Sequence, residues 1–297
     1  MTIQLLSAAT VEPVSLAEAK VHLRVTGDEE DDLIEALIVA AREKAEHETG
    51  RTLIAQTYRL SLDSFPPDAR YMNGINGNHQ HMPTWGYWYG AHTPKTLPFI
   101  ASPVRVVASV KYRDTDGVLQ TVSPADYVVD LYSDPSRITP ATGSAWPSHW
   151  SQPGAVEIVF SAGYAVPVSV DVGANTIAVA NWESLAVGYP VRLSNVGGVL
   201  PTPLKPKTDY YVQSVVSPGV YTLSAAFGGS QLDLTDAGTG ATLLGEVPWS
   251  IRAWMLAAIG TMYANRESMV VATARNSVND LPFFDGLLDR YRTYAVA

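Results

Sequence analysis

The sequence predicts an α+β fold in which N- and C-terminal helices pack together around a central antiparallel β region. Apolar residues recur with helical spacing near the two ends of the chain, over residues 15–50 and 248–294. Between them, polar and apolar residues alternate with the period of a strand, as in 57–63. Residues 171–246 combine short strand-like runs with frequent glycines and lack helical spacing, which indicates an inserted small all-β domain.

The first predicted helix begins at a capping box. Ser15 and Glu18 stand three residues apart, so each is expected to satisfy a free backbone amide of the first turn. The helix should run from Leu16 to about Val25, where Thr26-Gly27 ends it.

A second helix is expected from about Glu29 to Thr49. Asp28 is in position to cap its start, and Gly50 suits the left-handed residue that ends a helix. The apolar stripe of this helix is wide, so more than one neighbouring element should cover it.

The remaining elements follow in order. Strands are expected at 57–63, 104–113, 118–122, 127–131 and 155–160, with a hairpin turn at Asp116-Gly117 and a loop from Pro140 to Pro153. A helix should start at Pro248, and a short one should span 283–294. We therefore expect one parent domain made of 1–170 (helical pair 15–50, β region 53–165) and 247–297, interrupted by the module 171–246.

Composition excludes several classes of protein. The 297 residues include no cysteine, which rules out disulfides and thiolate metal sites. The formal net charge is −9, which disfavours a protein that grips DNA by neutralising phosphates. No apolar run approaches the ~20 residues of a membrane-spanning helix, and no signal peptide is visible at the N-terminus.

Most of the net negative charge lies in residues 1–51, and acidic residues are densest in the run Asp28–Asp32. Acids in the first turn of a helix complement its dipole, which is the ordinary interpretation of this run. A second interpretation is a surface that faces DNA without binding it. The two interpretations are compatible.

The sequence offers little for catalysis. His79 and His81, with His92 nearby, are the best metal candidates, but zinc requires three or four ligands and the segment is an Asn/Gly-rich loop. The nucleophile pattern Gly-x-Ser-x-Gly is absent from the chain. We therefore expect no enzyme activity, no metal and no cofactor.

A long aromatic segment over 71–92 is the sharpest compositional feature. It contains four clustered aromatic residues, Trp85, Tyr87, Trp88 and Tyr89. These side chains could stack on sugars, anchor a protein interface or fold back as a local core. The sequence leaves the three alternatives open.

Short motifs occur along the chain in a distinctive order: Pro13–Lys20, Glu48–Arg51, Asp126-Tyr127, Trp146-Pro147, Val156–Tyr164, Val247-Pro248, Met262–Glu267 and Leu287–Arg292. In this order they resemble the head–tail connector (adaptor, head-completion) family of tailed bacteriophages. The resemblance covers residues 11–65, 97–165 and 247–294. The chain departs from the family at 171–246, and this insertion resembles small β modules of phage structural proteins.

The resemblance implies a structural virion protein without catalysis. Family members form a homo-oligomeric ring, commonly of twelve copies, beneath the portal protein at one capsid vertex. Such a ring extends the DNA channel, lets DNA pass without specific binding and docks the stopper or tail proteins. The implied location is the virion neck, after assembly in the host cytoplasm and without contact with a membrane. The alternative is a glycan- or host-binding β-rich virion module, based on the aromatic segment and the insertion.

Candidate residues for these roles follow from the resemblance and the helical pattern. Ring packing is assigned to Leu33, Leu37, Ile38, Ile251, Trp254, Met255, Ile259 and Met262, although Trp254 and Met255 also suit the core of their own helix. Contact with the portal or a neighbouring subunit is assigned to Arg266, Leu288, Arg290, Tyr291 and Arg292. The acidic residues Asp28, Glu29, Glu30, Asp31 and Asp32 would face the channel, and Trp85, Tyr87, Trp88 and Tyr89 would form a partner-contact loop.

Overall fold

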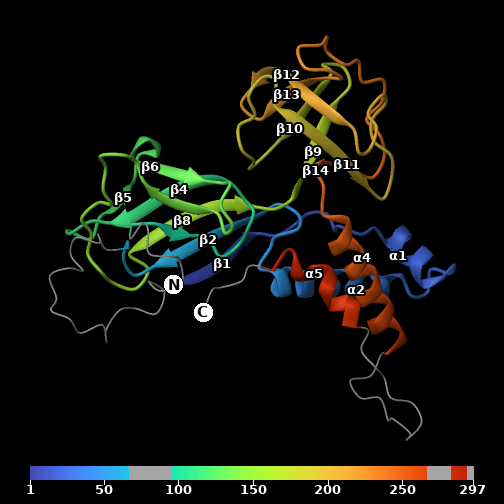
Figure 1. Ribbon diagram of the computed structural model, residues 1–297, viewed down its shortest axis with the longest axis horizontal. Helices are drawn as coiled ribbons and strands as arrows, with labels where there is room; N and C mark the ends of the chain where they lie inside the picture. Colours follow the sequence, from blue (N-terminus) through green and yellow to red (C-terminus); the bar gives the residue numbers. More distant parts are fainter. Residues whose placement is uncertain (67–94, 266–281, 293–297) are drawn as a thin grey trace, which may run out of the picture. The chain divides into compact units, whose positions relative to one another are not determined.

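The computed structural model describes residues 1–66, 95–265 and 282–292, with the backbone alone for 282–285 (Figure 1). The chain forms two compact units. The first unit contains Met1–Ala8 and Gln56–Ala162, and the second contains Ala9–Ala55 and Gly163–Arg292. The predicted α+β class with an all-β module is confirmed.

An antiparallel five-stranded sheet forms the main part of the first unit, in the order β1-β2-β8-β4-β5 (Figure 1). Its strands are β1 (Thr2–Ser7), β2 (Gln56–Leu62), β4 (Val104–Arg113), β5 (Leu119–Thr121) and β8 (Val156–Ala162). All but β1 match strands that the sequence predicts. The sequence pattern missed β1 because the adjacent Leu5 and Leu6 interrupt its alternation.

A second, three-stranded sheet belongs to the same unit. It consists of β3 (Leu97–Pro98), β7 (Arg137–Pro140) and β6 (Tyr127–Asp130), and a 3-10 turn at Pro124–Asp126 precedes β6. Phe99 and Ile138 from this part share one buried core with Leu60, Ile158 and Phe160 of the larger sheet. The two sheets therefore form one hydrophobic core.

Four helices lie in the second unit within the described residues: α1 (Leu16–Leu23), α2 (Asp31–Thr49), α4 (Trp249–Ala264) and α5 (Pro282–Asp289). Helix α4 contacts α1, α2 and α5, so the N- and C-terminal helices pack together as predicted. One face of α2 is buried, and its residues are Ile34, Ile38, Ala41, Ala45 and Thr49. Gly50 ends α2 with φ +66°, as its position suggested.

The beginning of the helical pair differs from prediction in two places. Helix α1 ends at Leu23, because Arg24 adopts the left-handed conformation with φ +60°, two residues before the expected stop at Thr26-Gly27. Helix α2 begins at Asp31, and no side chain caps it. The expectation that Asp28 caps α2 is wrong, because its carboxylate binds Lys20 instead.

The second unit also contains a closed β-barrel in the order β10-β13-β12-β11-β14-β9 (Figure 1). Its strands are β9 (Ala165–Asp171), β10 (Thr176–Val179), β11 (Pro190–Val196), β12 (Asp209–Ser217), β13 (Val220–Ser224) and β14 (Ala241–Gly245). Gly219 adopts φ +80° in the β12–β13 hairpin, a conformation that glycine takes without steric cost. Barrel residues Ala165 and Leu243 are buried in the same cluster as Ile38 and Met255, so the helices and barrel share a core.

Candidate assembly surfaces

The acidic run before and within the start of α2 is organised by one lysine from α1. Lys20 Nζ donates hydrogen bonds to Asp28 Oδ1 and Asp31 Oδ1, both at 2.7 Å. The hydrogen bond from Lys20 holds the pKa of the Asp28 carboxyl below its ordinary value and raises the pKa of Lys20. Since Glu29 and Asp32 remain exposed, the surface is acidic despite this ion pairing.

The other acid of the run, Glu30, faces a different helix. The hydroxyl of Tyr263 in α4 donates a hydrogen bond to its carboxylate. Asp31 and Asp32 lie in the first turn of α2, where negative charge complements the helix dipole. The run therefore serves the local structure, and it also presents exposed negative charge.

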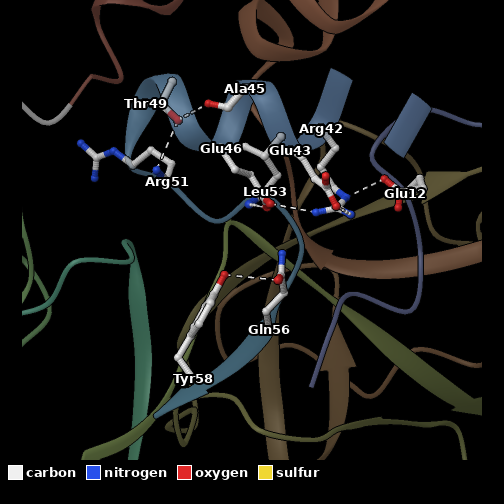
Figure 2. A network of polar contacts seen from close by, with 10 residues as sticks. All are labelled: Glu12, Arg42, Glu43, Ala45, Glu46, Thr49, Arg51, Leu53, Gln56 and Tyr58. Carbon is white, nitrogen blue, oxygen red and sulfur yellow. Dashed lines mark hydrogen bonds and ion pairs between the residues drawn. The ribbon is translucent and has the colours of Figure 1, made fainter. Parts of the chain in front are cut away.

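A partly buried polar network, which the sequence did not reveal, holds the middle of α2 (Figure 2). Arg42 Nε donates to Glu12 Oε2, and Arg42 Nη1 donates to Glu46 Oε2, both at 2.8 Å. Glu46 also accepts the backbone N–H of Leu53 at 2.8 Å. The network thus joins the chain before α1 and the chain after α2 to the same helix. The one sequence signal for this network was the spacing of Arg42 and Glu46, which are four residues apart and so lie on the same face of a helix.

Glu12 is the titrating member of this network. Burial raises the pKa of the Glu12 carboxyl above its ordinary value of 4.5, and the charge of Arg42 offsets this only in part. The folded protein therefore binds this proton more tightly than the unfolded chain does.

We expect this proton to make stability depend on pH. The contribution of protonated Glu12 is fully present below the unfolded pKa and is lost as pH rises through the raised folded value. Glu12→Gln removes the titration but keeps an oxygen that accepts from Arg42. Urea unfolding between pH 4 and 7 should show the variant gaining stability relative to wild type as pH rises. A difference between the two proteins that is constant over this range would contradict the assignment.

The C-terminal end of the described chain is fixed to the end of α2. Arg51 Nε donates to the backbone carbonyl of Tyr291 at 2.8 Å. The Tyr291 ring meets Tyr164 edge to face, with centroids 6.4 Å apart. Arg292 pairs with Asp289 at 2.9 Å and approaches Glu48 at 3.5 Å. These contacts fix the backbone on both sides of Arg290, whose side chain is exposed.

The eight residues assigned to ring packing divide into two groups. Five are buried in the core of their own subunit, with at most 2% of each residue exposed: Ile38, Ile251, Trp254, Met255 and Ile259. Leu288, assigned to the portal or neighbour interface, is also buried in this core. For these six residues the assignment is wrong, because a side chain enclosed by its own subunit has no surface left for a neighbour.

The other three ring-packing candidates are Leu33, Leu37 and Met262, and they are half-buried. Ala40, one turn beyond Leu37, is exposed. One flank of the wide apolar stripe of α2 is therefore only partly covered within the subunit. Within the described residues, apolar surface of this flank therefore stays accessible.

An exposed aromatic residue, which the sequence pattern did not single out, lies at the start of α4. Trp249 is 53% exposed, and its ring is flanked by the cations of Lys207 at 4.8 Å and Arg252 at 4.6 Å. Arg252 Nη2 also donates to Glu18 Oε2 at 2.6 Å. The Glu18 carboxylate therefore binds α4, whereas the capping box predicted that it would accept a backbone N–H at the start of α1. The other half of the capping box is present, because Ser15 Oγ accepts the Glu18 N–H.

Some predicted positions lie outside the described residues. These are Trp85, Tyr87, Trp88, Tyr89, Arg266 and the histidines His79, His81 and His92. In the part of the chain that is described, no three His, Asp or Glu side chains are grouped as a metal site would require. No helix in that part is both long and apolar enough to span a membrane.

Comparison with known proteins gives a match to one family over part of the chain and a similar fold over all of it. Residues 13–73, which include α1 and α2, match the family described as Phage gp6-like head-tail connector protein. A chain in the neck of an empty gene transfer agent (GTA) particle has a similar fold, with a TM-score of 0.54 and 16% identity. The similarity covers 100% of this chain and 98% of that one. A chain in the virion of the native particle has a TM-score of 0.50 and 17% identity over the same shares. No curated protein matches the chain.

Proposed function

Since residues 13–73 belong to the phage gp6-like head-tail connector family and the whole chain shares the fold of a solved neck protein, we propose that it is a ring-forming structural subunit of a virion neck. Its ring binds the portal protein, extends the DNA channel and docks the stopper or tail, and it catalyses no reaction. The observation that carries the proposal is that the fold similarity extends over the full length of both chains, insertion included.

The partly covered flank of α2 supports ring formation. Leu37 packs against the core of its own subunit and is half-buried, Leu33 is also half-buried, and Ala40 extends the apolar strip into solvent. A neighbouring copy that covers this strip would bury the rest of the wide stripe. Met262 on α4 offers a similar half-buried apolar side chain.

The acidic run suits the surface of a conduit. DNA passes through such a ring without being held, so the lining should not neutralise phosphates. Glu29 and Asp32 are exposed, and Lys20 compensates only part of the charge of the run. We assign Asp28–Asp32 to the channel face on this basis.

Arg290 is the exposed cation that we assign to portal binding. The backbone around it is held by Arg51 on Tyr291 and by the pairing of Arg292 with Asp289, so its position is fixed by the fold. Arg290→Glu should weaken binding to purified portal rings by about tenfold, because it reverses a charge at the interface without disturbing the core. Arg24→Glu, which reverses an exposed cation after α1, is the matched control and should bind like wild type.

Portal binding is best measured by surface plasmon resonance on immobilised portal rings at two salt concentrations. Loss of binding in Arg290→Glu alone, with a weaker salt dependence, supports the assignment. Equal binding by both variants would remove Arg290 from the interface. Failure of the wild-type chain to bind portal at all would contradict the portal-binding role itself.

A further inference from the structure

Strand β1 forms an open edge of the five-stranded sheet. Within the described residues it pairs with β2 on one side, and no strand follows it on the other. An edge strand presents unpaired backbone N–H and C=O groups to its surroundings. Leu5 and Leu6 are 48% and 43% exposed, and a β-bulge between Leu5 and Ser7 shifts the pairing of β1 with β2 there. Exposed apolar side chains therefore lie along this open edge.

The edge lacks most of the features that protect edges from pairing. Proteins protect edge strands with charged side chains, prolines, β-bulges or covering elements. Strand β1 contains neither a proline nor a charged side chain, and its β-bulge lies between Leu5 and Ser7, so Thr2–Gln4 keep a regular edge. The other sheet of the same unit has a proline and a charge: Pro98 lies in its edge strand β3, and Asp130, paired with Arg137 at 2.9 Å, ends its other edge strand, β6. Both of these features are missing from β1.

Among the described strands, the opposite end of the five-stranded sheet is a second open edge. Strand β5 has the uncharged sequence Leu-Gln-Thr, and Val118 and Leu119 are 55% and 47% exposed. Every neighbouring pair from β1 to β5 is antiparallel, so four reversals of direction separate the two edge strands. As a result, β1 and β5 run in the same direction.

We propose that neighbouring copies join through these two edges, with β1 of one copy lying parallel to β5 of the next. The proposal rests on the ring proposed above and names one of its interfaces. A head-to-tail contact of this kind uses two different surfaces of each subunit, and it closes into a ring when the rotation between copies allows it. A second copy fits better than an unrelated peptide, because each chain carries both complementary edges. The three residues of β5 make each junction short, so the closed ring depends on all of its junctions together.

Two double variants test the proposal by placing two lysines at one edge. The first combines Leu5→Lys with Leu6→Lys, and the second combines Val118→Lys with Leu119→Lys. All four side chains are exposed in the subunit, so folding should be preserved. Tyr132→Lys, in a loop of the same unit where the tyrosine is 96% exposed, is the control. If the β1 double variant loses its thermal transition, Gln4→Lys on the same strand takes its place.

Native mass spectrometry should give rings for wild type and Tyr132→Lys, and monomers for each double variant alone. An equimolar mixture of the two double variants should give dimers and nothing larger, because one copy retains an intact β1 and the other an intact β5. Rings from either double variant would overturn the proposal and leave the ring function standing. Dimers that form from the β5 variant alone would show that β1 pairs with itself, which also overturns it. If wild type forms no ring with or without portal protein, the proposed function fails as well.

Discussion

Ile259→Ala should destabilise the subunit itself by about 3 kcal/mol, because it removes a buried side chain and leaves a cavity in the core. Ile259 is fully buried in α4, in the cluster that α2 and the barrel also share. In a unit of this size the change should lower the melting midpoint by roughly 6–12 °C. The pattern of apolar residues along α4 had suggested that Ile259 packs between copies of the chain.

Met262→Ala, three residues further along the same helix, is the matched control. Met262 is half-buried against the same cluster, so its loss should cost about 1 kcal/mol or less in the isolated subunit. Thermal unfolding followed by circular dichroism, at concentrations where the subunit is monomeric, compares the two variants. If Ile259→Ala melts like wild type and only impairs oligomerisation, Ile259 is an interface residue after all.

Gly163→Ala is expected to destabilise the second unit by about 2–4 kcal/mol, since a Cβ at this position has no room. Gly163 has φ +155°, and an added Cβ would lie 2.6 Å from the backbone nitrogen of Ala55. The two segments cannot easily separate here, because the Ala55 N–H donates to the carbonyl of Ala165 at 2.8 Å. The backbone itself would have to move.

Gly173→Ala provides the comparison for this substitution. Gly173 does not have a positive φ, and the nearest atom to an added Cβ is Asp171 Oδ1 at 3.4 Å. We expect an effect within about 0.5 kcal/mol. Chemical unfolding of both variants would measure the difference. Equal stabilities for Gly163→Ala and wild type would mean that the close approach of 54–55 to Gly163 is not a feature of the folded protein.

The sequence predicted the helices, strands and turns that are determined by residues close together in the chain. The buried face of α2, with Ile34, Ile38, Ala41 and Ala45, repeats at helical spacing, and Gly50 ends the helix where a left-handed residue is needed. Strand β2 was recognisable from its alternation, and the β4–β5 hairpin from its turn residues Asp116-Gly117. In each case neighbouring residues along the chain determine the structure.

The sequence did not predict side-chain contacts between residues that lie in different elements of the chain. Asp28 looked like a helix cap, but Lys20 from the preceding helix binds its carboxylate. Glu18 looked like half of a capping box, but its carboxylate accepts a hydrogen bond from Arg252, more than two hundred residues later. An apolar stripe also cannot reveal which side chains face the core and which face another copy, and this is why Ile259 was assigned to ring packing. The network of Glu12 and Arg42 was missed for the same reason.

The stoichiometry of the wild-type chain with portal protein decides whether the chain is a ring-forming neck subunit. Native mass spectrometry of the purified chain, alone and mixed with portal rings, reports whether it forms one closed oligomer and whether that oligomer binds. We predict a single ring species that joins the portal as a complete ring. A chain that stays monomeric under both conditions and does not bind the portal would contradict it.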